Sequence, residues 1–264
     1  MTTKNYNLEV SGVGAVVLTV NEYGEGQPFL ILHGGGGPQT VAGFAAKLAE
    51  AKQAHVIVPV HPGFGGTGRS EKLTTIKDLA ALYIMLLDAL EINDVTVIGN
   101  SIGGWIAAEM SLMDTDRISS IILVDAVGIE VPNHPVVDIF TITLDELAKL
   151  SYYDPVKFAI DPSKLPPAIQ AQMPQNRASL KIYNGEKPGV DPSLKNRLSG
   201  VQVPTLVLWG ESDKIVDPDY GKEYAKAIPT AQFKLLKKTG HLPQLEVPEE
   251  LLEQVWEFST TNKR

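Results

Sequence analysis

The chain reads Ile98-Gly99-Asn100-Ser101-Ile102-Gly103-Gly104 at the point where an apolar strand pattern, 95–98, gives way to a helical pattern, 105–113. A Gly-x-Ser-x-Gly motif between a strand and a helix is typical of a nucleophile elbow, a sharp turn that exposes the serine hydroxyl above a sheet. Glycines flank such a serine because a side chain there would collide with the neighbouring strand or helix. The helix N-terminus also favours developing negative charge. Ser101 is therefore the candidate nucleophile.

A second glycine-rich turn follows another apolar strand, in the stretch Leu32-His33-Gly34-Gly35-Gly36-Gly37-Pro38. Glycines let backbone N–H groups approach a substrate closely, so such a loop can stabilise the oxyanion that develops in acyl transfer. We predict that the N–H groups of Gly35 and Ile102 form the oxyanion hole, although the pattern does not fix which glycine of 34–36 donates. Three neighbouring residues are predicted substrate contacts: Gly34, Gly36 and Asn100.

A candidate acid follows a third apolar strand, 204–209, because Asp213 stands in the loop directly after it. A carboxylate in that loop could orient an imidazole, and the chain order Ser, Asp, His fits it. Asp125, at the end of another apolar strand, is a rival for this role. Asp217 precedes a proline and suits a helix cap or turn better. The order and the loop position favour Asp213 as the acid.

The candidate base is His241, in the Gly-flanked stretch Lys238-Thr239-Gly240-His241-Leu242-Pro243. A histidine in a loop near the end of the chain suits a general base between a serine and a carboxylate. The other histidines have settings that suit structural or surface roles, and they are His33, His55, His61 and His134.

Together these motifs resemble those of the α/β-hydrolase superfamily. The matching stretches occur in family order: His33-Gly34-Gly35-Gly36, His61-Pro62-Gly63-Phe64-Gly65, Gly99-Asn100-Ser101-Ile102-Gly103, Gly210-Glu211-Ser212-Asp213 and Gly240-His241. The resemblance implies an α/β-hydrolase fold with a mostly parallel eight-stranded sheet flanked by helices, and a serine hydrolase that needs no metal and no organic cofactor. Many relatives carry Asp where this chain has His61, which puts in doubt only the local hydrogen bonding of that turn.

The composition narrows the class of protein. The 264 residues include no cysteine, which excludes disulfides, thiolate metal sites and a cysteine nucleophile. A net charge of −8 argues against nucleic acid or an anionic membrane as a partner. The first residues lack the apolar run of a signal peptide, and no segment approaches the roughly 18 apolar residues of a membrane span. We expect a cytoplasmic enzyme with a small-molecule substrate, either a monomer or a dimer.

Apolar patterns alternate along the chain as a parallel sheet with covering helices requires. Strands are predicted near 8–11, 15–20, 28–32, 55–60, 95–99, 118–125, 204–209 and 231–236. Helices are predicted near 40–51, 74–92, 101–113, 219–228 and 248–259. The glycines at Gly12 and Gly14 predict an antiparallel hairpin at the sheet edge.

The alternation breaks in the segment 128–197, where prolines are frequent and no strand is evident. Helical patches near 143–150, 155–160 and 166–183 carry apolar and aromatic side chains that can pack. The segment falls between the sixth core strand and the strand before Asp213, where members of the superfamily insert a helical cap. We therefore expect a core of 1–127 and 198–264 and a cap of 128–197, with the ligand between them.

The motifs leave the substrate open. The first hypothesis is hydrolysis of a small or medium carboxylic ester through an acyl-enzyme on Ser101. The second is hydrolysis of a carbon–carbon bond in ring-fission (diketo acid) products. Relatives of that kind share the His-Gly-Gly-Gly loop, but many carry Trp where this chain has Leu242, and a cap arginine for which Arg177 is the candidate here. A third hypothesis, a ligand-binding receptor on a hydrolase fold, is disfavoured by the intact Ser, Asp and His set.

Overall fold

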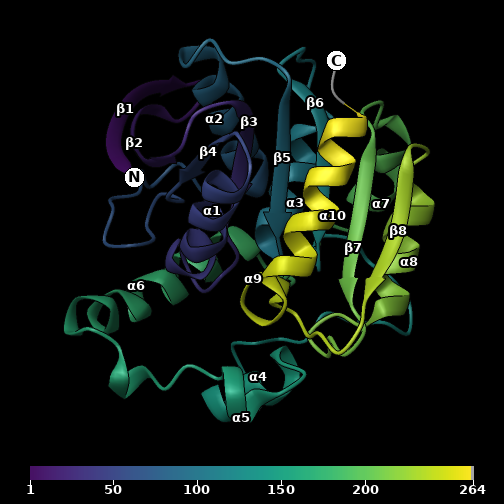
Figure 1. Cartoon of the computed structure of the whole chain (residues 1–264). Coiled ribbons are helices and arrows are strands. Elements are labelled where there is room, and N and C mark those ends of the chain that lie inside the picture. Colours follow the sequence, from purple (N-terminus) through teal and green to yellow (C-terminus); the bar gives the residue numbers. More distant parts are fainter. Residues whose placement is uncertain (263–264) are drawn as a thin grey trace.

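The computed structural model describes residues 1–262 and is built around one sheet (Figure 1). Its strands are β1 (Thr2–Val10), β2 (Gly14–Tyr23), β3 (Gln27–Leu32), β4 (Ala54–Pro59), β5 (Val95–Asn100), β6 (Ile118–Val124), β7 (Thr205–Gly210) and β8 (Ala231–Leu236). They lie in the order β1-β2-β4-β3-β5-β6-β7-β8. Because β2 is antiparallel to both β1 and β4 and every other pair is parallel, only β2 runs against the rest. The predicted eight-stranded, mostly parallel sheet is confirmed.

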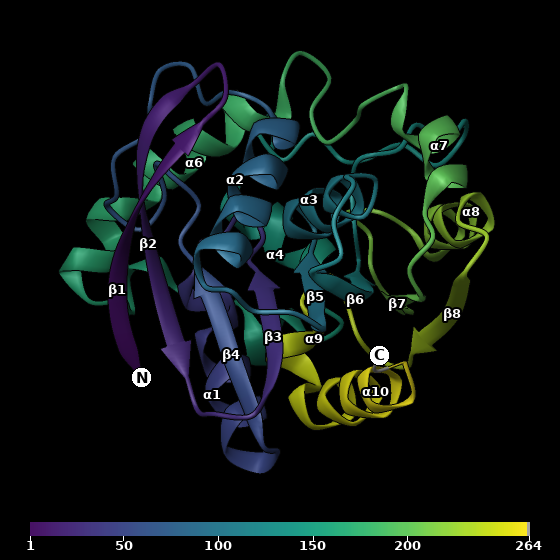
Figure 2. The same cartoon turned by 90° about the horizontal axis from the view of Figure 1, so that it is seen from above.

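Helices cover both faces of the sheet (Figure 2). One apolar cluster joins the sheet to α1 (Gln39–Ala51) and α10 (Pro248–Thr261). The other joins it to α2 (Ile76–Ala89), α3 (Ile102–Met110) and α8 (Pro218–Ala227). Every residue of the central strands β5, β6 and β7 is buried, which explains their continuous apolar sequences.

The predicted edge hairpin is present, with Val10 paired to Gly14. The first strand is longer than predicted, since it begins at Thr2 rather than near residue 8. Its first four residues are exposed and the fifth is half-buried. These residues show no apolar alternation and are held by backbone pairing with β2. No helix within residues 1–262 combines the length and apolar character needed to cross a membrane.

The segment between β6 and β7 forms helices and turns. They are α4 (Leu144–Ser151), α5 (Pro155–Phe158), η1 (Pro162–Lys164), α6 (Pro167–Asn184), α7 (Leu194–Arg197) and η2 (Leu198–Gly200). Figure 1 shows α4, α5 and α6 set apart from the sheet, beyond its lower edge. Both ends of the segment are tied to the core, because Tyr220 of α8 bonds Ile129 through its hydroxyl, and Arg197 forms an ion pair with Glu109 of α3.

One face of α6 is pinned to the turn that follows β4. Its buried residues recur at helical spacing and include Asn176, Ser179, Leu180 and Tyr183. The Ser179 hydroxyl donates to the Gly63 carbonyl at 2.9 Å and the Tyr183 hydroxyl to the Pro62 carbonyl at 3.0 Å. α6 is thus held over the core by polar contacts as well as by apolar burial.

Candidate active site

Ser101 occupies the turn between β5 and α3, with φ 56° and ψ −119°. A non-glycine residue with positive φ is strained, and such strain is kept mainly where it serves a site. The flanking glycines are required, because a Cβ on Gly99 would lie 2.1 Å from the Gly103 carbonyl oxygen, and one on Gly103 would lie 2.1 Å from that of Leu32. The collisions expected from the sequence are therefore confirmed.

The strained turn is fixed by its own backbone hydrogen bonds. The Ser101 N–H donates to the Val124 carbonyl of β6 at 3.0 Å, and the Ser101 carbonyl accepts from Gly104 at 3.0 Å and from Val127 at 3.3 Å. Bonds to two different elements hold the serine in place, while its side chain stays partly exposed.

His241 and Asp213 form a buried pair. His241 Nδ1 donates to Asp213 Oδ2 at 2.7 Å, and the two side chains are 8% and 0% exposed. Asp213 Oδ1 accepts the N–H groups of Ile215 at 2.8 Å and of Val216 at 3.2 Å. Three donors therefore stabilise the charged carboxylate, and the donation from Nδ1 leaves Nε2 as the nitrogen that can accept a proton.

Asn100 connects the elbow to the His241 loop. Its Nδ2 donates to the His241 carbonyl at 3.0 Å and more weakly to the Val124 carbonyl at 3.3 Å, and its Oδ1 accepts from Gln244 Nε2 at 3.2 Å. The side chain is buried and engaged in these bonds. They give Asn100 a positioning role, while its contact with substrate stays a prediction.

Ser101 and His241 lie on loops that Asn100 joins, but no hydrogen bond links their side chains among residues 1–262. The geometry thus brings two of the three residues into contact and holds the third on an adjoining loop.

The glycine loop after β3 lies against the elbow. A Cβ on Gly34 would lie 3.3 Å from the Ser101 Cβ, and one on Gly35 would lie 2.5 Å from Leu180 Cδ2 of α6. Ile102 is the first residue of α3, so its N–H has no acceptor four residues earlier in the helix. Gly36 is exposed, and its carbonyl accepts from Gln39 Nε2. The loop therefore borders both Ser101 and α6.

Three buried side chains hold the start of this loop. His33 Nε2 accepts the His61 N–H at 3.1 Å, so the His33 proton is on Nδ1, which donates to the Gly34 carbonyl at 2.8 Å. His61 Nε2 donates to the His33 carbonyl at 2.9 Å, and burial keeps this ring neutral, so its Nδ1 accepts from the Tyr83 hydroxyl. Both imidazoles are therefore neutral with fixed tautomers. His61, which departs from the family pattern, supports the loop beside Ser101.

These imidazoles predict an acid-sensitive fold. Burial lowers the pKa of His33 from 6.5 to about 4, and burial followed by the neighbouring His33 lowers the pKa of His61 well below its ordinary value. In the unfolded chain, His33 and His61 bind protons at a higher pH than they do in the folded protein. The free energy of unfolding therefore falls as pH drops below about 6.5. His33 alone should cost roughly 3 kcal/mol by pH 4.

Urea unfolding of wild type and His33→Gln at several pH values checks this prediction. The variant should show a shallower loss of stability between about pH 6.5 and 4.5, even if it is less stable throughout. Thr40→Val, at a buried side chain that does not titrate, is the control for a general loss of stability and should keep the wild-type slope. Equal slopes for wild type and His33→Gln would contradict the assignment.

The His241 loop is also bonded to the segment of α4 and α5. The His241 N–H donates to the Ser151 carbonyl at 2.7 Å. The Glu246 carboxylate, in α9 (Pro243–Glu246), accepts from the N–H groups of Gly240 at 2.6 Å and Tyr153 at 2.9 Å. Neither Glu246 nor Gln244 was identified from the sequence, because a four-residue helix gives no periodic signal.

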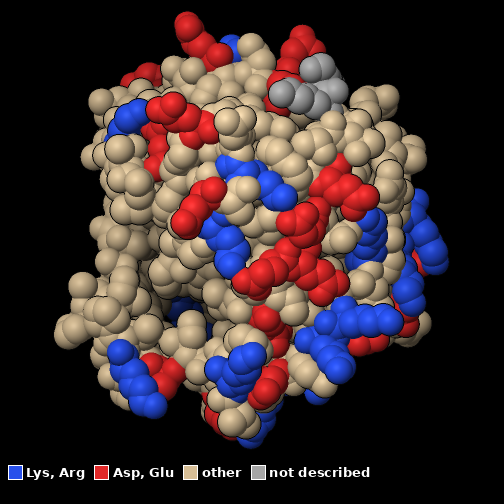
Figure 3. All heavy atoms as spheres, viewed as in Figure 1, with Lys and Arg blue, Asp and Glu red and all other residues tan. Residues whose placement is uncertain are grey.

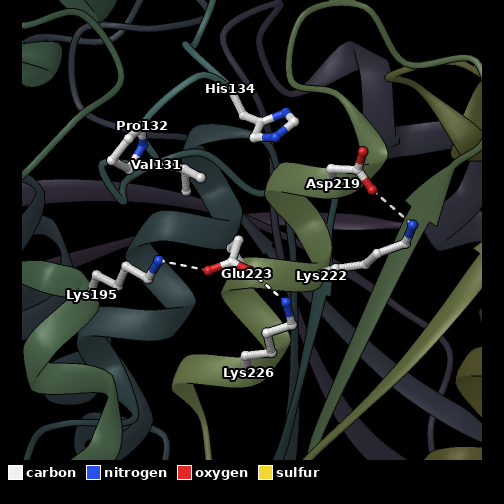
Figure 4. Close-up of a pocket in the computed structure, with 8 residues that line it drawn as sticks. All are labelled: Val131, Pro132, His134, Lys195, Asp219, Lys222, Glu223 and Lys226. Atoms are coloured by element: carbon white, nitrogen blue, oxygen red, sulfur yellow. Dashed lines mark hydrogen bonds and ion pairs between the residues drawn. The ribbon is translucent and has the colours of Figure 1, made fainter.

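In two other clusters on the surface, the charged side chains pair with one another. Figure 4 shows a surface pocket near α8 in which Glu223 pairs with Lys195 and Lys226, and Asp219 pairs with Lys222. None of the candidate catalytic residues lines it. The cluster His134, Asp217 and Asp219 could offer three ligand atoms to a cation, but Asp217 already caps α8 and bonds His134.

The surface of the protein is hollowed beside α6. Figure 3 shows this hollow at the lower left, where Figure 1 places α6 beside the core, and shows acidic and basic side chains mixed over the same face. Arg177 of α6 donates to the Ile139 carbonyl at 3.0 Å and lies over the Phe140 ring at 5.3 Å. Its charge is thus engaged within the segment between β6 and β7.

The chain is similar to known hydrolases over most of its length. A profile of the Alpha/beta hydrolase family matches residues 29–254. Lipase 1 of Psychrobacter immobilis is 26% identical over 85% of this chain and 74% of its own length. A 2-hydroxymuconate semialdehyde hydrolase of Pseudomonas putida is 27% identical over 90% of this chain and 89% of its own length.

Solved structures share the fold over nearly the whole chain. A thermophilic esterase from Thermogutta terrifontis superposes with a TM-score of 0.80 at 23% identity, covering 99% of this chain and 100% of the esterase. A meta-cleavage product hydrolase from Pseudomonas fluorescens IP01 superposes with a TM-score of 0.75 at 22% identity, covering 97% of each chain.

Proposed function

This chain is a hydrolase of the Alpha/beta hydrolase family, and we propose that it cleaves a small or medium carboxylic ester through an acyl-enzyme on Ser101. One observation carries the proposal: the strained Ser101 elbow adjoins a buried His241–Asp213 pair, and Asn100 joins the two loops. A strained serine beside an imidazole that a carboxylate orients is the arrangement required for nucleophilic catalysis.

In the proposed acylation step, Ser101 Oγ attacks the ester carbonyl carbon while His241 Nε2 accepts the hydroxyl proton. Asp213 holds the imidazole in the tautomer that makes this possible and stabilises its charged form. The carbonyl π electrons move to oxygen, and the N–H groups of Gly35 and Ile102 bind the resulting oxyanion. The C–O bond then breaks, and His241 returns the proton to the leaving alkoxide.

Deacylation repeats the same steps with water. His241 accepts a proton from a water molecule as its oxygen attacks the acyl carbon, and the second tetrahedral oxyanion uses the same N–H groups. Collapse of this intermediate breaks the bond to Ser101 Oγ, which takes the proton back from His241. The acid product leaves and the enzyme is restored.

A second substrate class is kept as an alternative. The 2-hydroxymuconate semialdehyde hydrolase matches this chain over nine tenths of its length, as closely in identity as the lipase does. This supports a carbon–carbon bond of a ring-fission (diketo acid) product as the bond that is cleaved. Because Arg177 is engaged with Ile139 and Phe140, it supports this reading less than the sequence alone suggested.

Turnover assays separate these hypotheses. Purified enzyme is tested with p-nitrophenyl acetate and butyrate and, in parallel, with a 2-hydroxy-6-oxo-dienoate. Ester turnover that exceeds turnover of the dienoate supports the proposal, and the reverse result selects the carbon–carbon reading. A ligand-binding receptor would bind without multiple turnover of either substrate.

We expect the face of α6 that meets the core to select the acyl group. Leu180 lies against Gly35 of the proposed oxyanion loop, so Leu180→Ala should enlarge the site beside the acyl carbon. The ratio of kcat/KM for bulky over short esters should rise roughly ten-fold, the scale of one or two methylenes in an apolar pocket. The control is Ile182→Ala, on an exposed position of the same helix, which should leave the ratio unchanged. If this ratio of kcat/KM values were the same in Leu180→Ala and Ile182→Ala, α6 would not line the acyl site.

A further inference from the structure

Asp125 is a fully buried carboxyl directly behind the His241–Asp213 pair, and the mechanism above does not use it. It follows the last residue of β6. Its Oδ1 accepts the Gly210 N–H at 2.7 Å, whereas its Oδ2 is buried and has no hydrogen-bond partner among residues 1–262. Oxygens of Asp125 and Asp213 and a ring nitrogen of His241 lie within 4.8 Å of one another. A buried polar oxygen without a partner in such a cluster requires an explanation.

The two carboxyl groups differ in the donors that reach them. Asp213 accepts from Ile215, Val216 and His241, so its negative charge is stabilised by three N–H groups. Among residues 1–262, the Asp125 carboxyl accepts from Gly210 alone. Two adjacent buried carboxyls cannot both ionise at low cost, and the one with fewer donors keeps the proton.

We propose that Asp125 is a protonated positioning residue, whose Oδ2–H serves the Asp213 carboxylate as a hydrogen-bond donor and fixes it for His241. Oxygens of the two carboxyls lie within 4.8 Å of one another, so a proton on Asp125 Oδ2 would have a carboxylate acceptor close by. The proton also accounts for the unpartnered Oδ2, since a neutral hydroxyl is far less costly to bury than an unpaired charge.

The groups around Asp125 also favour its protonated form. The titratable groups that face it are Asp213 from the loop after β7, His241 from the loop after β8, and Glu246 from α9. Burial, and then the charge of Asp213, raise the pKa of the Asp125 carboxyl well above its ordinary value, and the Glu246 charge adds to this.

A neutral Asp125 matters for the base. A second negative charge this close to His241 would stabilise the imidazolium and so reduce the neutral imidazole that accepts the Ser101 proton. Protonated Asp125 supports Asp213 without adding that charge. This consequence for catalysis rests on the proposed function, whereas the protonation of Asp125 does not.

The first test compares the pH profile of kcat/KM for wild type and Asp125→Asn. Asn keeps an acceptor for Gly210 and a donor for Asp213, so the proposal predicts near wild-type kcat and an acid limb at the same pH. If Asp125 were instead charged, its replacement would remove a negative charge next to His241 and move the acid limb down by on the order of one to two pH units. That shift would overturn the proposal.

The second test uses Asp125→Leu, which keeps the branched shape of the side chain but has no donor. Losing the hydrogen bond to a charged carboxylate should lower kcat roughly ten- to hundred-fold, with KM little changed. If Asp125→Leu and Asp125→Asn both kept the wild-type kcat, the donor would not be needed and the proposal would be overturned.

The third test needs no activity and holds even if Asp125→Leu fails to fold. The infrared difference spectrum of wild type minus Asp125→Asn at neutral pH should contain a carboxylic-acid C=O band. A carboxylate band in its place would overturn the proposal. Because this measurement does not involve Ser101, failure of the serine mechanism and failure of the Asp125 assignment are distinguishable.

Discussion

Ser101→Ala should leave the protein folded and lower kcat by about 10⁴-fold or more, as removal of a triad nucleophile does elsewhere. The variant removes only the hydroxyl, and Ala at φ 56° is as strained as Ser, so the elbow keeps its hydrogen bonds to Val124 and Gly104. Steady-state hydrolysis of p-nitrophenyl butyrate measures the effect, and the urea midpoint shows that stability is retained.

Ser111→Ala is the matched control for this substitution. Ser111 ends the same helix, is partly buried, and donates to the Ala108 carbonyl at 2.7 Å. This variant should turn over the ester at the wild-type rate. If purified Ser101→Ala kept activity comparable to that of Ser111→Ala, Ser101 would not be the nucleophile.

Asp213→Asn should lower kcat by about 10⁴-fold, through the tautomer of His241. The side-chain oxygen of Asn would keep the acceptor position facing Ile215 and Val216, where Asp213 Oδ1 now accepts two N–H groups. The amide NH₂ would then face His241 Nδ1, which could no longer donate. The proton would move to Nε2, and the imidazole could not accept the Ser101 proton.

Asp217→Asn provides the comparison for this effect. Asp217 Oδ1 caps α8 by accepting the Tyr220 N–H at 3.0 Å, and Asn is an equally good cap. Its kcat should remain near that of wild type. A larger loss of kcat in Asp217→Asn or Asp125→Asn than in Asp213→Asn would show that the acid is placed in the wrong loop.

The sheet was predictable from the sequence because its central strands are buried on both faces and read as continuous apolar runs. The start of β1 was not, since residues 2–5 are exposed and become a strand only by pairing with β2. The short helices α7 and α9 were missed for a related reason, because four residues complete barely one helical turn and show no period.

Local motifs also identified the loops of the candidate site. They could not predict the contacts between loops that are distant in the sequence. Gly99 and Gly103 follow from the collisions that any elbow must avoid. The bond from Asn100 to the His241 carbonyl joins residues far apart in sequence, so its positioning role depends on how β5 and the loop after β8 meet. The unpartnered oxygen of Asp125 likewise exists only in the folded cluster.

Covalent labelling tests most directly whether Ser101 is the nucleophile. The protein is treated with a fluorophosphonate, which reacts with activated serines, and is examined by intact-mass measurement and peptide mapping. If Ser101 is the nucleophile, we expect one adduct per chain, on Ser101, with no adduct in Ser101→Ala and greatly slowed labelling in Asp213→Asn. An adduct on another residue, or no adduct in a preparation that hydrolyses the ester, would contradict this assignment.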